Sequence, residues 1–176
     1  MKKIFAILAL AISGTAFAAD YVSVAVDNVQ GLKGGQDSTA QYVRFGKGFG
    51  DYQFNVQSRT AKFKDNTTGQ SLEATVANKN VSAFGITPFV GTGHDITGYN
   101  YGLVGATAGA QVGPGYLLGG AKQRVGSTET AMTHQRVLFA SYSVPVAKNV
   151  SVDLNGSKSY QTIKEAAWGL GVTFGF

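Results

Sequence analysis

The last nine residues of the chain, Trp168–Phe176, alternate strictly between large apolar and small side chains. Because successive side chains of a β-strand point to opposite faces, one face carries every large apolar group. These are Trp168, Leu170, Val172, Phe174 and Phe176. An edge strand of this kind would promote aggregation in water. The pattern is typical of a strand with one face in lipid and aromatic residues at the water interface. A buried strand of a soluble sandwich is the alternative.

The same segment resembles the closing strand of bacterial outer-membrane β-barrels, which commonly ends in a C-terminal Phe. The resemblance implies that the barrel-assembly machinery is a partner and reads the five apolar residues of this strand as an assembly signal. Ser141–Leu154 resembles a hairpin of Gram-negative porins, with Ser141-Tyr142 and Ala147-Lys148 at the characteristic places. This porin resemblance covers the C-terminal quarter of the chain. The chain is much shorter than full-length porins and has no long constriction loop, so the resemblance favours a barrel in a membrane more than an open pore.

The N-terminus has the pattern of a secretory signal peptide. Lys2 and Lys3 precede an apolar stretch, Ile4–Ile12, and Ala16-Phe17-Ala18 forms a small-x-small cleavage site. We therefore predict a signal peptide over residues 1–18, cleaved after Ala18 or Ala19, and an outer-membrane barrel over residues 19–176. The predicted location is the bacterial outer membrane, with its lipid as a partner.

Composition narrows the function classes. Without Lys2 and Lys3, 13 basic residues remain against 10 acidic ones, a net charge of about +3. No basic run or RNA-binding motif accompanies this charge, so nucleic acid is not an expected partner. The sequence has no cysteine, which leaves neither disulfides nor thiolate metal sites. Oligomeric state cannot be predicted from these features.

Period-two stretches recur along the mature chain and are separated by longer connections that alternate with three-residue turns. The expected connections are Asn28–Asp37, Gly48–Gly50, Lys64–Gln70, Asn78–Asn80, Gly91–Gly98, Gly113–Gly115, Gly126–Thr133, Ala147–Asn149 and Gln161–Glu165. Nine connections predict an all-β, antiparallel, up-and-down transmembrane barrel of ten strands, with both termini at the periplasmic end. Eight strands are the alternative, because the stretch Ser71–Ala77 is short and could belong to a loop.

If Val, Leu and aromatic residues face lipid, the polar residues between them face the lumen. The charged candidates for the lumen are Arg44, Arg59, Glu73, Arg124, Arg136 and Asp153; Lys122, Gln53, Asn55, Gln57 and Asn155 share their faces. Basic groups outnumber acidic ones in this set, which predicts a narrow aqueous path that repels cations. The other interpretation, which the cost of burial favours, is a lumen filled by Arg–Glu and Arg–Asp pairs, because an isolated buried charge is very costly.

The titratable residues give little support to catalysis. His94-Asp95 and His134 lack the paired carboxylates of outer-membrane proteases and the nearby serine of barrel acyl-lipid enzymes. We expect no catalytic residues, no metal site and no cofactor. The sequence favours a porin-like barrel that forms a narrow passive channel for ions or small solutes. A non-conducting structural or adhesive barrel acting through its surface loops is the alternative.

Overall fold

The computed structural model describes residues 21–32, 36–81, 85–126, 135–161 and 164–176. The predicted signal peptide lies outside these residues. The described residues form ten antiparallel strands of 10 to 13 residues. The strands are β1 (Tyr21–Leu32), β2 (Ser38–Phe49), β3 (Tyr52–Phe63), β4 (Thr68–Asn78), β5 (Ile86–Asp95), β6 (Asn100–Val112), β7 (Gly115–Gly126), β8 (Gln135–Ala147), β9 (Val150–Gln161) and β10 (Lys164–Gly175).

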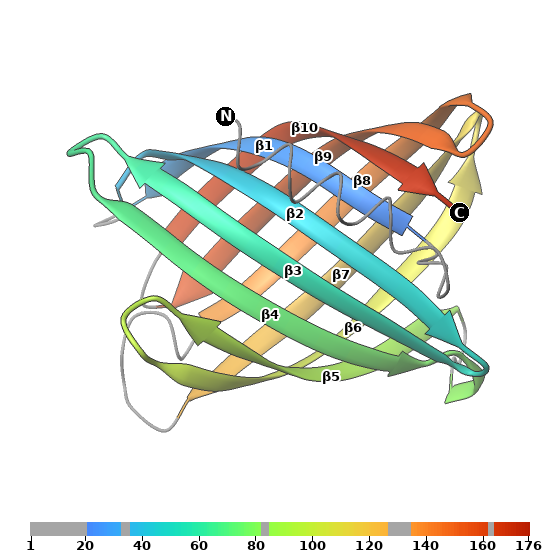
Figure 1. Cartoon of the computed structure of the whole chain (residues 1–176), viewed down its shortest axis with the longest axis horizontal. Helices are drawn as coiled ribbons and strands as arrows, with labels where there is room; N and C mark the ends of the chain where they lie inside the picture. Colours follow the sequence, from blue (N-terminus) through green and yellow to red (C-terminus); the bar gives the residue numbers. More distant parts are fainter. Residues whose placement is uncertain (1–20, 33–35, 82–84, 127–134, 162–163) are drawn as a thin grey trace.

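The sheet closes into a barrel because β1 pairs with β2 on one side and with β10 on the other (Figure 1). Every other pair joins strands that are consecutive in the chain. Tyr21 lies opposite Gly175, so the first and last strands begin and finish at the same end of the barrel. We call this the turn end; it also carries the connections 50–51, 79–85, 113–114 and 148–149. The loop end carries 33–37, 64–67, 96–99, 127–134 and 162–163.

The structure confirms ten strands rather than eight. The uncertain stretch Ser71–Ala77 lies within β4, which pairs along its length with β3. The predicted alternation of long and short connections is only partly correct. The connection after β4 spans residues 79–85 rather than Asn78–Asn80, because Lys79–Val81 form a 3₁₀ turn (η1) and Gly85 has a φ of 75°. At the loop end, the connection between β9 and β10 is only two residues long.

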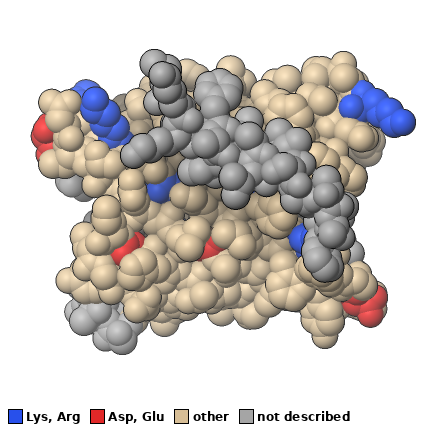
Figure 2. All heavy atoms as spheres, in the orientation of Figure 1, with Lys and Arg blue, Asp and Glu red and all other residues tan. Residues whose placement is uncertain are grey.

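The outer face of the barrel is largely apolar. Outward side chains in the ten successive strands include Val26, Phe45, Val56, Leu72, Val90, Val104, Val125, Leu138, Leu154 and Leu170, each of them exposed. Figure 2 shows that most of the visible surface is neither acidic nor basic, with the most prominent charged side chains towards its two ends. Within the described residues, no helix is long and apolar enough to cross a membrane.

Inside the barrel, large aromatic side chains lie over glycines. A Cβ atom at Gly93 would lie 2.2 Å from the Tyr101 ring, and one at Gly105 would lie 2.4 Å from the Phe89 ring. The same relation joins Tyr21 to Gly46 and Phe139 to Gly120. Each pair lies directly opposite in register, so glycine gives its neighbour room to fill the interior. The expectation that aromatic residues face lipid is therefore wrong for these four rings. Phe89 and Phe139 alternate with outward Val90 and Leu138, which are also apolar, so the two faces look alike in the sequence.

Candidate functional site

The inner face of the barrel encloses a cavity of about 1020 Å3 to which all ten strands contribute side chains. Polar and aromatic groups form most of its lining. The cavity wall includes Tyr21, Tyr42, Arg44, Gln57, Arg59, Glu73, Phe89, Thr107, Lys122, Arg124, Phe139, Asn155 and Glu165. It is the candidate site, because it brings together most of the polar residues that the sequence assigned to the lumen.

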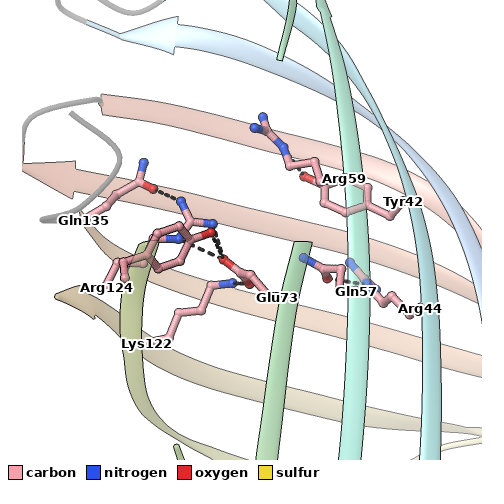
Figure 3. A network of polar contacts seen from close by, with 9 residues as sticks. Tyr42, Arg44, Gln57, Arg59, Glu73, Lys122, Arg124 and Gln135 are labelled. Carbon is pink, nitrogen blue, oxygen red and sulfur yellow. Dashed lines mark hydrogen bonds and ion pairs between the residues drawn. The ribbon is translucent and has the colours of Figure 1, made fainter. Parts of the chain in front are cut away.

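Glu73 is the centre of one buried polar cluster (Figure 3). Its carboxylate accepts a 2.5 Å bond from Lys122 Nζ and bonds of 2.9 and 2.6 Å from Arg124 Nε and Nη2. The Tyr101 hydroxyl donates to the same carboxylate at 3.2 Å, and Arg124 Nη1 donates to the Gln135 side chain. We call these five residues the Glu73 cluster. Glu73 and Arg124 are 5% and 7% exposed.

The barrel closure brings this cluster together. Glu73 comes from β4, whereas Lys122 and Arg124 come from β7, and β5 and β6 separate these strands in the wall. The ion pairs therefore cross the interior instead of following the sheet. A carboxylate with two cations and good geometry offsets much of the cost of burying the charges. The cluster ties two distant parts of the wall to each other.

A second group lies on β2 and β3. Arg44 Nε donates to Gln57 Oε1 at 2.8 Å, and Arg59 Nε donates to the Tyr42 hydroxyl at 3.2 Å. The Arg44 guanidinium carbon lies 5.1 Å from the centre of the Tyr42 ring, within the range of a cation–π contact. These hydrogen-bond partners are neutral, in contrast to the carboxylate that Arg124 contacts in the Glu73 cluster. In Figure 3 the two groups come from different strands, and the outer nitrogens of Arg59 point away from Tyr42.

The third polar area lies on β1, β9 and β10. Asp27 and Asn155 both lie opposite Gly169 in register, from β1 and β9 respectively. Asp153 Oδ2 accepts a 2.5 Å bond from the Thr173 hydroxyl. Among the described residues, Oδ1 of Asp27, Oδ1 of Asp153 and Nδ2 of Asn155 are buried without a hydrogen-bond partner. Buried polar atoms of this kind usually find a partner in water or another bound group.

Of the charged residues that the sequence assigned to the lumen, the structure brings five to the inner face. Arg44, Arg59, Glu73, Arg124 and Asp153 all point inward. Arg136 does not. It is exposed on the outer face, where its Nε donates to Gln123 Oε1 at 2.9 Å, and the prediction for this residue is wrong. Its neighbours Val137 and Leu138 are both apolar, so local alternation did not reveal which face Arg136 occupies.

The predicted excess of positive charge inside is also wrong. Among the described strand residues, the inward acidic groups are Asp27, Glu73, Asp95, Asp153 and Glu165, and the inward basic groups are Arg44, Arg59, Lys122 and Arg124. Asp27 alternates with outward valines, so the sequence did contain a signal for its orientation. Asp95 and Glu165 lie in strands where the sequence predicted loops. The interior charge is therefore nearly balanced.

Of the two histidines weighed as catalytic candidates, the structure describes His94. His94 is exposed and bonds to Asn100, whereas Asp95 points inward and accepts bonds from Thr97 and Tyr99. His134 lies outside the described residues. Within the described part of the chain, no group of three or more metal-binding side chains comes together.

The closing strand keeps the two faces expected from its sequence. Trp168, Leu170 and Phe174 are exposed on the outer face, and Val172 shares that face. Gly169 and Gly171 are buried on the inner face. Phe176, which follows β10, is 58% exposed. This arrangement presents a continuous apolar strip along β10, next to the seam with β1.

No protein-family model and no curated protein matches the chain. Among solved structures, the KdgM porin in complex with oligogalacturonate has a TM-score of 0.50 at 7% identity, covering 89% of this chain and 99% of the porin. Neisserial surface protein A has a TM-score of 0.46 at 14% identity, covering 89% and 95%. Outer membrane phospholipase A from Escherichia coli has a TM-score of 0.46 at 11% identity, covering 91% and 98%. At these identities the KdgM likeness establishes a shared barrel fold and nothing about activity.

Proposed function

We propose that this chain is an integral outer-membrane β-barrel that forms a narrow passive channel for ions or small polar solutes, without enzymatic activity. The observation that carries the proposal is the cavity of about 1020 Å3, lined mostly by polar residues, inside a closed barrel whose outer face is apolar. A soluble monomer rarely exposes a contiguous apolar surface this extensive. A membrane barrel requires it, since lipid replaces water around the wall.

The cavity has features that suit small polar solutes. Its two arginines on β2 and β3 bond through Nε to neutral groups, and both side chains line the lumen. The atoms of Asp27, Asp153 and Asn155 that lack a partner among the described residues offer further contacts. They lie on the neighbouring part of the wall, formed by β1, β9 and β10. Near-balanced charge favours passage of small ions of either sign over strong selection for one.

The same proposal includes orientation and assembly. The start of β1 and the end of β10 both lie at the turn end. In outer-membrane barrels, the short turns and the chain termini face the periplasm. The outward apolar strip of β10, from Trp168 to Phe176, would be the feature read by the barrel-assembly machinery. Export through the predicted signal peptide would bring the chain to that machinery.

Conductance in planar lipid bilayers tests the channel directly. The refolded protein should give small, ohmic single-channel currents. Thr107 lines the cavity, whereas Ala108 next to it faces outward and is exposed. Thr107→Trp should lower the conductance because an indole would occupy the path, and Ala108→Trp should leave it unchanged.

Failure would be informative as well. A folded, heat-modifiable barrel without conductance in the wild type would refute the channel and leave the structural or adhesive role. Recovery of the mature protein from the soluble periplasm, without a heat-dependent shift in gel mobility, would refute the membrane location.

A further inference from the structure

Charged side chains of the barrel wall are segregated by sign. Within the described strands, every Asp and Glu points inward, and every outward side chain with a full charge is basic. The outward set is Lys47, Lys62, Arg136, Lys158 and Lys164. The outer face therefore carries positive charge that no carboxylate of the strands compensates.

Three of these residues lie together at the loop end, on the neighbouring strands β8, β9 and β10. Arg136 lies opposite Tyr160 in register, and Lys158 Nζ is 5.4 Å from the centre of the Tyr160 ring. Lys164 is the first residue of β10, two positions from Ala166, which lies opposite Lys158. We call Arg136, Lys158, Tyr160 and Lys164 the basic rim patch. All four side chains are exposed.

The patch borders the apolar wall. Lys158 lies opposite Leu138, and two positions further into each strand Gly156 lies opposite Trp168. The next outward row contains Leu154 opposite Leu170, both exposed. Rows of basic, mixed and then apolar side chains follow one another from the loop end towards the middle of the barrel. An aromatic ring among cations above an apolar wall is the arrangement expected where lipid headgroups meet water.

We propose that the basic rim patch binds the phosphate group of an anionic membrane lipid in the leaflet at the loop end. This inference rests on the membrane location proposed above, and it does not depend on whether the lumen conducts. Arg and Lys bind phosphate through charge-assisted hydrogen bonds, and the hydrogen-bond partner of Arg136 among the described residues, Gln123, is neutral. The lipid chains would then lie against Leu138, Leu154 and Trp168 below the patch.

Trp168 provides a local reporter, because it is the one tryptophan of the sequence and lies next to the row of Lys158. The protein is refolded into phosphatidylcholine vesicles that contain increasing fractions of phosphatidylglycerol, with brominated chains on one lipid or the other. Brominated phosphatidylglycerol should quench Trp168 more strongly than brominated phosphatidylcholine at equal mole fraction. High salt should reduce the difference.

The double variant Arg136→Gln/Lys158→Gln should lose most of this preference, since each basic residue near a surface contributes about fivefold to binding of anionic lipid. Lys62→Gln is the matched control, because it removes an outward charge from β3, which β1 and β2 separate from β10. Its preference should match that of the wild type. The gel-mobility shift on heating verifies that each variant has folded.

Three results would overturn the inference. Equal quenching by the two lipids in the wild type would mean that the patch does not select the anionic lipid. The quenching itself would still support the membrane location. A preference that persists in the double variant would place its origin elsewhere. Absence of quenching by either lipid would instead refute the membrane location and, with it, this inference.

Discussion

Replacing Glu73 with Gln should destabilise the barrel, because it removes the carboxylate from the Glu73 cluster. That carboxylate accepts bonds from Lys122 and Arg124 at 2.5 to 2.9 Å and from Tyr101 at 3.2 Å. A Gln side chain has the same shape but offers one neutral acceptor oxygen and an NH2 group that opposes a cation. Two buried positive charges would then lie close together without a negative partner.

The size of the effect follows from burial. Glu73 is 5% exposed, and the Lys122 and Arg124 side chains are 15% and 8% exposed. Breaking a buried ion pair by removing one partner costs roughly 3–5 kcal/mol, against less than about 1 kcal/mol for an exposed pair. The measurement is the free energy of unfolding in urea after refolding into detergent micelles. Lys122→Gln added to Glu73→Gln should restore part of the loss, because it removes one unpaired cation.

Glu165→Gln is the matched control. Glu165 also points inward, but it is half-buried at the loop end and outside the Glu73 cluster, so its loss should cost little. A Glu73→Gln variant that loses less than about 1 kcal/mol, or no more than the control, would refute the reasoning. Bilayer recordings separate two roles of the cluster. A shift of the reversal potential towards anions would place Glu73 on the ion path, whereas lower stability without conductance would favour a structural plug.

Three further predictions concern other parts of the barrel. Gly169→Ala should lower the free energy of unfolding by roughly 1–3 kcal/mol more than Gly156→Ala in the same urea assay. A Cβ at Gly169 would lie 2.1 Å from the Val26 carbonyl oxygen, whereas the nearest atom to a Cβ at Gly156 would be 3.9 Å away. Equal losses in the two variants would contradict this prediction. Phe176→Ser should strongly lower the yield of protein in the outer membrane and only modestly lower its stability after refolding, since at most roughly 2–3 kcal/mol of apolar burial is lost. A normal membrane yield would be the contrary result. Hydrogen bonds from Lys64, the larger cause, and from the Gly31 amide hold the pKa of Asp37 below its usual 3.8. The ionised carboxylate therefore stabilises the folded state above that pH, and this contribution is lost as the pH falls through the lowered pKa. Asp37→Asn should therefore flatten the decline of stability in acid below about pH 4, and an unchanged pH profile would argue against the interaction.

Alternation along single strands predicted much of the barrel. On β9, Val152 and Leu154 face outward and Asp153 and Asn155 face inward, because polar and apolar groups occupy separate faces. The same reasoning failed on β8, where both faces are apolar and Arg136 has no local signal of its orientation. It also failed at the connection after β4, where Gly85 and a 3₁₀ turn shift the start of the next strand.

The partners inside the lumen could not be predicted from the sequence. Glu73 lies 49 and 51 residues from its two cationic partners, and strands β5 and β6 stand between them in the wall. Their contact depends on barrel closure, strand tilt and the space left by interior glycines. Single-strand patterns identify which side chains point inward, but they contain no information about which of them meet across the interior.

Some polar groups of the inner face have hydrogen-bond or ion-pair partners, and others have none among the described residues. The first kind can stabilise the barrel while the second kind lines a path through it. In the Glu73 cluster, opposite charges meet directly and Arg124 also bonds to Gln135, so little is gained by exchanging these contacts for water. On the wall of β1, β9 and β10, Asp27, Asp153 and Asn155 keep buried atoms without partners among the described residues, beside the bare backbone of Gly169. Fully satisfied networks rigidify a structure, whereas unsatisfied polar atoms gain most from a passing ion or water molecule. We therefore expect solutes to move along the β1–β10–β9 wall, with the Glu73 cluster holding the opposite part of the barrel in shape.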